Sequence, residues 1–200
     1  MVPMTTALLT PTLAVIHERR SVRSYTGDAV DRATIERLLD AAIWAPSAMN
    51  IQPWAFVVVE APELLSRFEA QAADLYFRDP PVPELAALEP DQLARLRELV
   101  RAPGFGILHG APALIVIYAT SAAGIPDCYL AAENLMLAAA TLGLGTCPIG
   151  LARPLLDEPD VKAELGVPRE YPCALPIVLG VPAADCTPPR RAQPRVMAWR

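Results

Sequence analysis

The chain has 200 residues, of which 53% are hydrophobic, and it carries a formal net charge of −5. That length suits one domain with a sizeable core, so we expect residues 1–200 to fold as a single unit. A negative net charge argues against nucleic acid as the main partner, because binding to a phosphate backbone favours a basic surface.

The first part of the chain predicts two helices and a strand. Thr12 can cap a short helix that ends near Arg19, and Asp31 can cap the next helix. Apolar residues of this second helix recur at the spacing of a single helix face until Pro46 stops it. Residues 55–59 are apolar and mostly β-branched, which predicts a short buried strand.

The same criteria predict further helices over 62–76, 90–101, 126–142 and 154–165, the last of them broken or staggered at Pro159, and strands over 113–119 and 174–181. The proline-rich stretch 79–90 is predicted to be a loop, and the tail 182–200 to be extended. The helix over 126–142 is apolar almost all round. We therefore expect it to be buried on every side, by the core or by a partner subunit.

Several kinds of site are not indicated. No Gly-x-Gly-x-x-Gly follows a strand and no Gly-x-x-x-x-Gly-Lys loop occurs, so side chains would have to hold the phosphate of any nucleotide. The four cysteines lack metal-binding spacing, and we expect no metal site. No targeting segment or membrane span is evident, which favours a cytoplasmic protein without a membrane partner.

Residues 18–23, Glu-Arg-Arg-Ser-Val-Arg, form the first motif. An arginine offers a planar fork of donors and a serine adds a short donor, so the cluster suits a phosphate. Nearly every basic residue of this chain is arginine, however, with Lys162 as the single lysine. A solvated surface is therefore the alternative interpretation of the cluster.

Residues 45–54, Ala-Pro-Ser-Ala-Met-Asn-Ile-Gln-Pro-Trp, form the second motif. They lie between a predicted helix and a predicted strand, and they combine prolines with polar side chains. A rigid polar loop in that position is a common place for a small-molecule site.

Together the two motifs resemble the nitroreductase family of FMN-dependent oxidoreductases, which shares the Arg-Arg-Ser-x-Arg run and the Pro-Ser-x-x-Asn-x-Gln-Pro-Trp loop. The resemblance covers residues 13–191. It implies an α+β fold with a mainly antiparallel central sheet flanked by helices, in an intertwined homodimer. It also implies FMN as cofactor, NAD(P)H as diffusible reductant, and a small acceptor such as a nitroaromatic or quinone, with ping-pong kinetics.

Two alternatives stay open at this point. The same fold can carry out other flavin reactions, such as dehalogenation, azoline oxidation or flavin cleavage. The chain can also be a non-enzymatic flavin-binding protein. The sequence alone does not name the acceptor, because the cofactor supplies the chemistry.

The resemblance also implies FMN ligands at two places. The phosphate and ribityl chain would be held by basic residues and a serine, which are Arg19, Arg20, Ser21, Arg190 and Arg191. Arg23 would lie near the flavin N1 and C2 carbonyl, where a fixed positive charge stabilises the anionic reduced ring. The loop that reaches the flavin, in many family members across a dimer interface, would contribute Pro46, Ser47, Asn50 and Gln52.

A third segment, residues 142–151, is rich in glycine and follows the apolar helix. Alone it predicts a helix C-cap and a turn. The family has a similar segment, whose backbone N–H points to the flavin N5. By resemblance, Pro148 and Ile149 would pack on the ring, and Gly150 or Leu151 would supply that N–H. No side chain is assigned as a catalytic acid or base.

Overall fold

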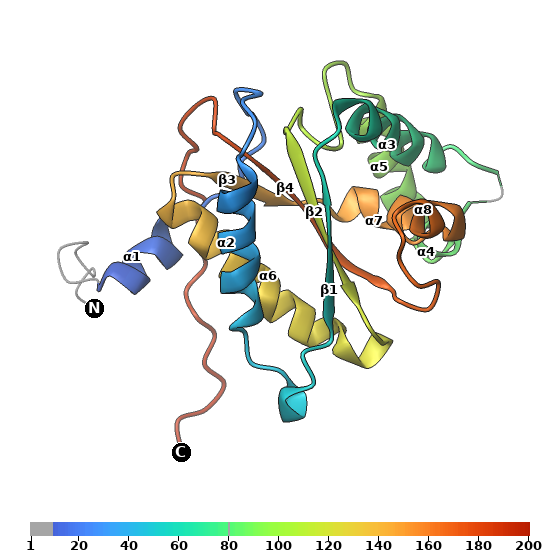
Figure 1. Cartoon of the computed structure of the whole chain (residues 1–200). Helices are drawn as coiled ribbons and strands as arrows, with labels where there is room; N and C mark the ends of the chain where they lie inside the picture. The colour runs from blue at the N-terminus through green and yellow to red at the C-terminus, as the bar shows by residue number, and fades with distance from the viewer. Residues whose placement is uncertain (1–9, 80) are drawn as a thin grey trace.

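The computed structural model describes residues 10–79 and 81–200. At its centre lies a four-stranded antiparallel sheet in the order β1-β2-β4-β3 (Figure 1). The strands are β1 (Trp54–Val59), β2 (Ala113–Ala119), β3 (Gly145–Pro148) and β4 (Cys173–Gly180). Every residue of β2 is buried, because this apolar run is covered on both faces.

Helices cover the two faces of the sheet, and alternate residues of β2 point to opposite layers. One layer holds α2 (Arg32–Ile43) and α6 (Ile125–Thr141), with α1 (Pro11–Glu18) against α6. The other layer holds α3 (Pro62–Leu75), α4 (Pro83–Ala86), α5 (Pro90–Arg101), α7 (Arg153–Leu156) and α8 (Pro159–Glu164). Short 3-10 turns are η2 (Ala48–Asn50), η3 (Ala122–Gly124) and η4 (Gly150–Ala152). This arrangement confirms the expected α+β fold.

Most predicted elements are confirmed, and the differences have local causes. Asp31 caps α2, its carboxylate accepting from the Thr34 N–H at 2.9 Å. The prediction for Thr12 is wrong: Thr10 is the N-cap of α1, because Pro11 begins the helix. The predicted loop over 79–90 contains α4, and the predicted turn after α6 contains β3.

The apolar helix α6 is buried on one side only within the chain. Leu135 is fully buried in the core, whereas Tyr129 and Leu130 are 42% and 47% exposed. The expectation that the helix is buried all round is therefore not met by the chain's own core. None of the helices in the described ranges has the length and apolar character needed to cross a membrane.

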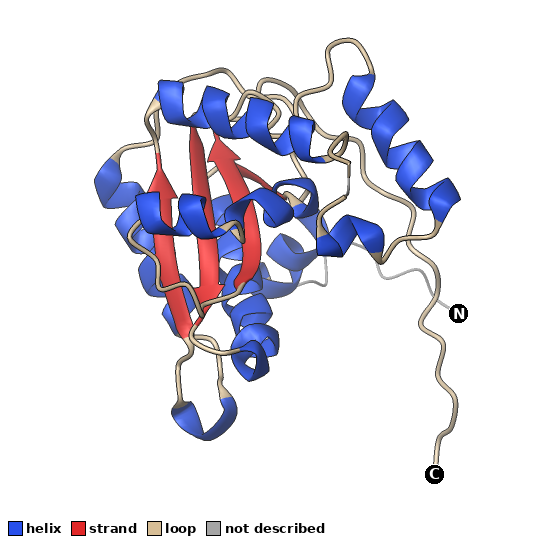
Figure 2. Cartoon of the chain, turned by 90° about the vertical axis from the view of Figure 1, so that its right-hand side faces the viewer, coloured by secondary structure: helices blue, strands red, loops and turns tan. Residues whose placement is uncertain are grey.

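The C-terminal tail has no regular element, as predicted, and Figure 2 shows it leaving the body of helices and strands. Its last part exposes large apolar side chains, with Met197 86% and Trp199 91% exposed. The earlier part of the tail, close to α1 and β3, contributes to the site described next.

Candidate functional site

The arginine-rich segment 19–23 leaves the end of α1 and runs beside β3. The Val22 N–H donates to the Thr146 carbonyl at 2.9 Å, and Ser21 forms a parallel bridge with the same residue. Gly145 permits this close approach, since a Cβ there would lie 2.7–2.9 Å from side-chain atoms of Val22. The glycine of β3 thus sets where Ser21 and its flanking arginines stand.

Segment 19–23 and the tail enclose a cavity of about 230 Å³, which we call the arginine cavity. Its lining residues are Arg19, Arg20, Ser21, Arg23, Cys186, Thr187, Pro189 and Arg191. Four arginines therefore line one small space, with no carboxylate among the described lining residues. This surrounding suits a phosphate. Arg190 is exposed and is not part of the lining, so the structure brings only one of the two tail arginines here.

Arg19 has a donor without an acceptor. Its Nε is buried and has no hydrogen-bond partner among the described residues, and the Glu133 Oε1 lies 3.6 Å away. Such a buried, unpaired donor costs about 1–3 kcal/mol, which a bound anion would relieve. Arg20 is already used in part, because its Nη1 donates to the carbonyls of His17 at 2.6 Å and Arg19 at 2.9 Å.

Arg23 influences two titratable groups that the sequence does not place near it. Burial raises the pKa of the Cys147 thiol, and the charge of Arg23 opposes that shift. Burial also lowers the pKa of His109, and Arg23 lowers it further. His109 has a left-handed backbone (φ 56°), and its ring meets Phe105 edge-on. Sequence reasoning missed His109 here because it lies far from Arg23 along the chain.

The second motif lies elsewhere. None of Pro46, Ser47, Asn50 and Gln52 lines the arginine cavity. The loop projects from the end of α2 and β1 (Figure 1), and Met49, Asn50 and Gln52 have left-handed φ values of 49°, 56° and 53°. The Ser47 Oγ accepts from the Gln52 N–H at 2.9 Å, which helps to fix the loop. Met49 is 89% exposed, so the rest of the chain leaves the tip of the loop uncovered.

The third segment continues β3 into η4. Pro148 ends the strand, and the buried Ile149 donates its N–H to the Pro176 carbonyl at 2.8 Å. Tyr76 holds the next turn, its hydroxyl donating to the Leu151 carbonyl at 3.1 Å. Burial raises the pKa of Tyr76 to about 12, so the hydroxyl stays protonated. Gly150 has no atom within 4 Å of where its Cβ would stand.

A polar group on α3 was not assigned from the sequence. Gln71 Oε1 is buried and lacks a hydrogen-bond partner in the described part of the chain. Its helix packs against η4 and α7. An unsatisfied amide oxygen in that layer is a candidate acceptor for a ligand N–H. Helical periodicity gives no signal for it, because a glutamine beside an apolar stripe usually faces water.

Comparisons with known proteins show the family and the fold of the chain. Residues 16–181 match the model described as the Nitroreductase family. An NADH dehydrogenase of Thermus thermophilus is 32% identical over 92% of this chain and 93% of its own. The structure of a nitroreductase with bound FMN from Desulfitobacterium hafniense aligns with a TM-score of 0.76 at 26% identity, covering 93% of this chain and 96% of the other. An FMN-dependent nitroreductase from Mycobacterium smegmatis in complex with NADPH aligns with a TM-score of 0.64 at 25% identity, covering 84% and 86%.

Proposed function

Because the chain belongs to the nitroreductase family, we propose that it is an FMN-dependent oxidoreductase that uses NAD(P)H to reduce a small acceptor, such as a nitroaromatic or quinone. The observation that carries the proposal is the arginine cavity, where four guanidinium groups and Ser21 converge. The unpaired Nε of Arg19 fits an anion at this place.

Different residues of the arginine cavity bind different parts of FMN. Arg19, Ser21 and Arg191 hold the phosphate, with Arg20 contributing beside its contact with the end of α1. Arg23, at the same cavity, supplies a fixed positive charge for the ring. Pro148 ends β3, the strand that bridges to Ser21, and Ile149, Gly150 and Leu151 follow it. Pro148 and Ile149 pack on the ring, and Gly150 or Leu151 supplies a backbone N–H to it.

When bound, FMN supplies the two-electron chemistry. The chain's contribution is to position the reductant and then the acceptor, and no side chain is assigned as an acid or base. We infer that both reactants use the same space beside Gly150, where a Cβ would meet no atom within 4 Å, so the first product must leave before the acceptor enters. Ping-pong kinetics follow from that sharing.

We also propose a homodimer in which the loop 46–52 of one protomer completes the site of the other. The loop is exposed, its backbone is strained, and it does not line the arginine cavity of its own chain. Large apolar side chains are exposed nearby and on other elements, and they include Leu13, Ile16, Ile43, Trp44, Met49, Ile51, Tyr129, Leu130, Val196, Met197 and Trp199. So many exposed apolar groups are typical of a subunit interface.

The proposal is tested with the purified holoprotein. We expect a yellow protein with one FMN per subunit, which NADH or NADPH bleaches without oxygen, and whose colour a quinone or nitroaromatic restores. Initial rates at several acceptor concentrations should give parallel double-reciprocal lines. A colourless protein that FMN cannot reconstitute would contradict the proposal. Destruction of the flavin on reoxidation by dioxygen would favour the flavin-cleavage alternative instead.

A further inference from the structure

A second cavity, of about 300 Å³, lies between the α4–α5 region and the η4–α7 turn. Its lining is largely apolar and includes Leu85, Leu88, Leu96 and Leu151, and we call it the leucine cavity. Arg153 is the one charged side chain among the described lining residues. A cavity of this volume is at the small end of ligand sites and suits a single aromatic ring.

The cavity adjoins the segment expected to face the flavin. Gly150 and Leu151 line it, and a Cβ at Gly150 would meet open space. The Leu151 carbonyl is held by the Tyr76 hydroxyl, so this wall is fixed from α3. Because that hydroxyl stays protonated, Tyr76 brings no negative charge to the lining.

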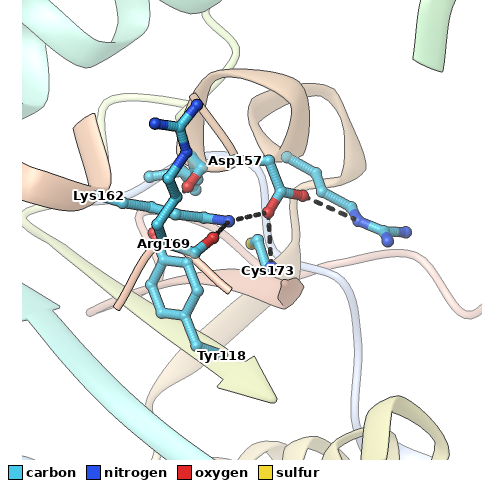
Figure 3. A network of polar contacts seen from close by, with 7 residues as sticks. Tyr118, Asp157, Lys162, Arg169 and Cys173 are labelled. Atoms are coloured by element: carbon cyan, nitrogen blue, oxygen red, sulfur yellow. Dashed lines mark hydrogen bonds and ion pairs between the residues drawn. The ribbon is translucent and has the colours of Figure 1, made fainter. Parts of the chain in front are cut away.

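Arg153 shares Asp157 with Lys162, so two cations face one carboxylate among the described residues. Asp157 Oδ1 accepts from the Lys162 Nζ at 2.9 Å and from the Cys173 N–H at 2.8 Å (Figure 3), so its shorter contacts go to groups other than Arg153. Lys162 is buried, and its ion pair with Asp157 balances the charge of that carboxylate. The Asp157 Oδ2 lies 3.9 Å from the Arg153 Nε, which is beyond hydrogen-bond distance.

The Nε of Arg153 is also buried without a hydrogen-bond partner within the described ranges. The side chain as a whole is 38% exposed, and Arg153 is one of the residues that line the cavity. A single guanidinium matches a carboxylate, which it can bind through two parallel hydrogen bonds. A neutral ring in the same place would leave Arg153 with its long contact to Asp157 alone.

We infer that the leucine cavity is a subsite for the electron acceptor, and that it selects aromatic acceptors carrying a carboxylate. The ring lies among the leucines, and the carboxylate pairs with Arg153. This inference rests on the proposed function, because Gly150 and Leu151 connect the subsite to the flavin-facing segment. Arg153 is thus a specificity-determining residue rather than a residue that takes part in electron transfer.

Equilibrium binding tests the subsite without turnover. Calorimetry on the oxidised holoprotein should show benzoate binding at least about tenfold more tightly than benzamide, its neutral counterpart. Arg153→Gln should weaken benzoate roughly ten- to a hundredfold, the loss of a charge-assisted contact, and leave benzamide within about twofold. Arg95→Gln, which removes the same charge from an exposed position on α5, should change neither ligand.

Turnover provides the second measurement. The KM for 4-nitrobenzoate should be lower than that for its methyl ester in the native protein, and Arg153→Gln should abolish this difference while kcat for the ester is retained. Leu96→Phe, which narrows the cavity and leaves its charge unchanged, should raise the KM for both acceptors. This variant tests whether the ring binds in the cavity if Arg153→Gln fails to fold.

Equal binding of benzoate and benzamide to the native holoprotein would overturn the inference, as would an unchanged preference in Arg153→Gln. These outcomes differ from failure of the proposed function. A holoprotein that NAD(P)H cannot bleach would contradict the oxidoreductase proposal. The calorimetric comparison of benzoate with benzamide involves no turnover and tests only the subsite.

Discussion

The two motifs near the N-terminus are equally conspicuous in the sequence, yet the fold treats them differently. Segment 19–23 packs beside β3 and meets the tail, so four arginines converge within one chain. The loop 46–52 projects away, with Met49 almost fully exposed and three residues in left-handed conformations. Segment 19–23 contacts other parts of the same chain, whereas the side chains of the loop 46–52 are mostly exposed to solvent.

The contrast teaches where a binding site is complete and where it is not. Strained backbone persists only where the surrounding structure holds it or a function needs it. In the arginine cavity, the buried Nε of Arg19 has no hydrogen-bond partner among the described residues, and a bound anion would accept from it. In the loop, exposed apolar side chains such as Met49 and Ile51 are of the kind that a protein interface buries. These observations support the proposal that the arginine cavity is one half of a site and the loop of a second copy is the other half.

The largest expected effect is at Arg19. Replacing it with alanine removes a charge-assisted phosphate contact and should weaken FMN binding roughly ten- to a hundredfold, about 1.5–3 kcal/mol. Arg37→Ala, on the exposed face of α2, is the control for net charge and should leave the affinity unchanged. Flavin release monitored by fluorescence measures both.

The tail arginines offer an internal control for the same claim. Arg191 lines the cavity and its neighbour Arg190 does not. Arg191→Ala should therefore weaken FMN more than Arg190→Ala does. An equal loss in the two variants would mean that general positive charge, rather than the cavity geometry, holds the phosphate.

Gly145 tests how the cavity is built. A Cβ at this position would stand 2.7–2.9 Å from side-chain atoms of Val22, so Gly145→Ala should lower the free energy of unfolding by about 1–3 kcal/mol and weaken FMN. Val22→Ala removes the atoms that clash. The double variant should recover part of the loss in a denaturant titration, and strict additivity of the two changes would contradict the packing account.

The sequence identified the arginine segment because its donors are local, and it identified the sheet because β2 and β4 are continuous apolar runs. It missed β3, since Gly145 and Pro148 at the two ends mask a strand whose stability comes from pairing with β4. It also missed His109 and Gln71, whose surroundings exist only after residues distant along the chain come together. The difference between Arg190 and Arg191 depends on which way an extended tail turns, and periodicity does not encode that.

Asn50 tests the other half of the comparison, with a smaller effect. An exposed amide makes a neutral hydrogen bond at best, so Asn50→Ala should weaken FMN by no more than about tenfold, or about 0.5–1.5 kcal/mol. The free energy of unfolding should stay the same, because Asn50 is exposed in its own chain. Asn50→Gly, which also tolerates the left-handed backbone, separates the side-chain loss from strain.

The smallest expected effect concerns pH. Burial and Arg23 hold the pKa of His109 below its ordinary 6.5. The unfolded chain therefore takes up the proton first as the pH falls below 6.5, and stability that is present above that pH decreases. His109→Gln should flatten this part of the stability profile in urea titrations at pH 7.5 and 5.5. An identical pH profile in the variant would contradict a lowered pKa of His109 in the folded protein.

Mixed dimers test the central claim most directly. Chains carrying Arg19→Ala and chains carrying Asn50→Ala, with different tags, are combined and the heterodimer is isolated, once each homodimer has been shown to bind FMN weakly. If the site is shared between protomers, one site of the heterodimer receives both substitutions and the other receives neither, so one FMN binds with native affinity. If each site belongs to a single chain, both sites carry a defect and no FMN binds with native affinity, which would contradict the account.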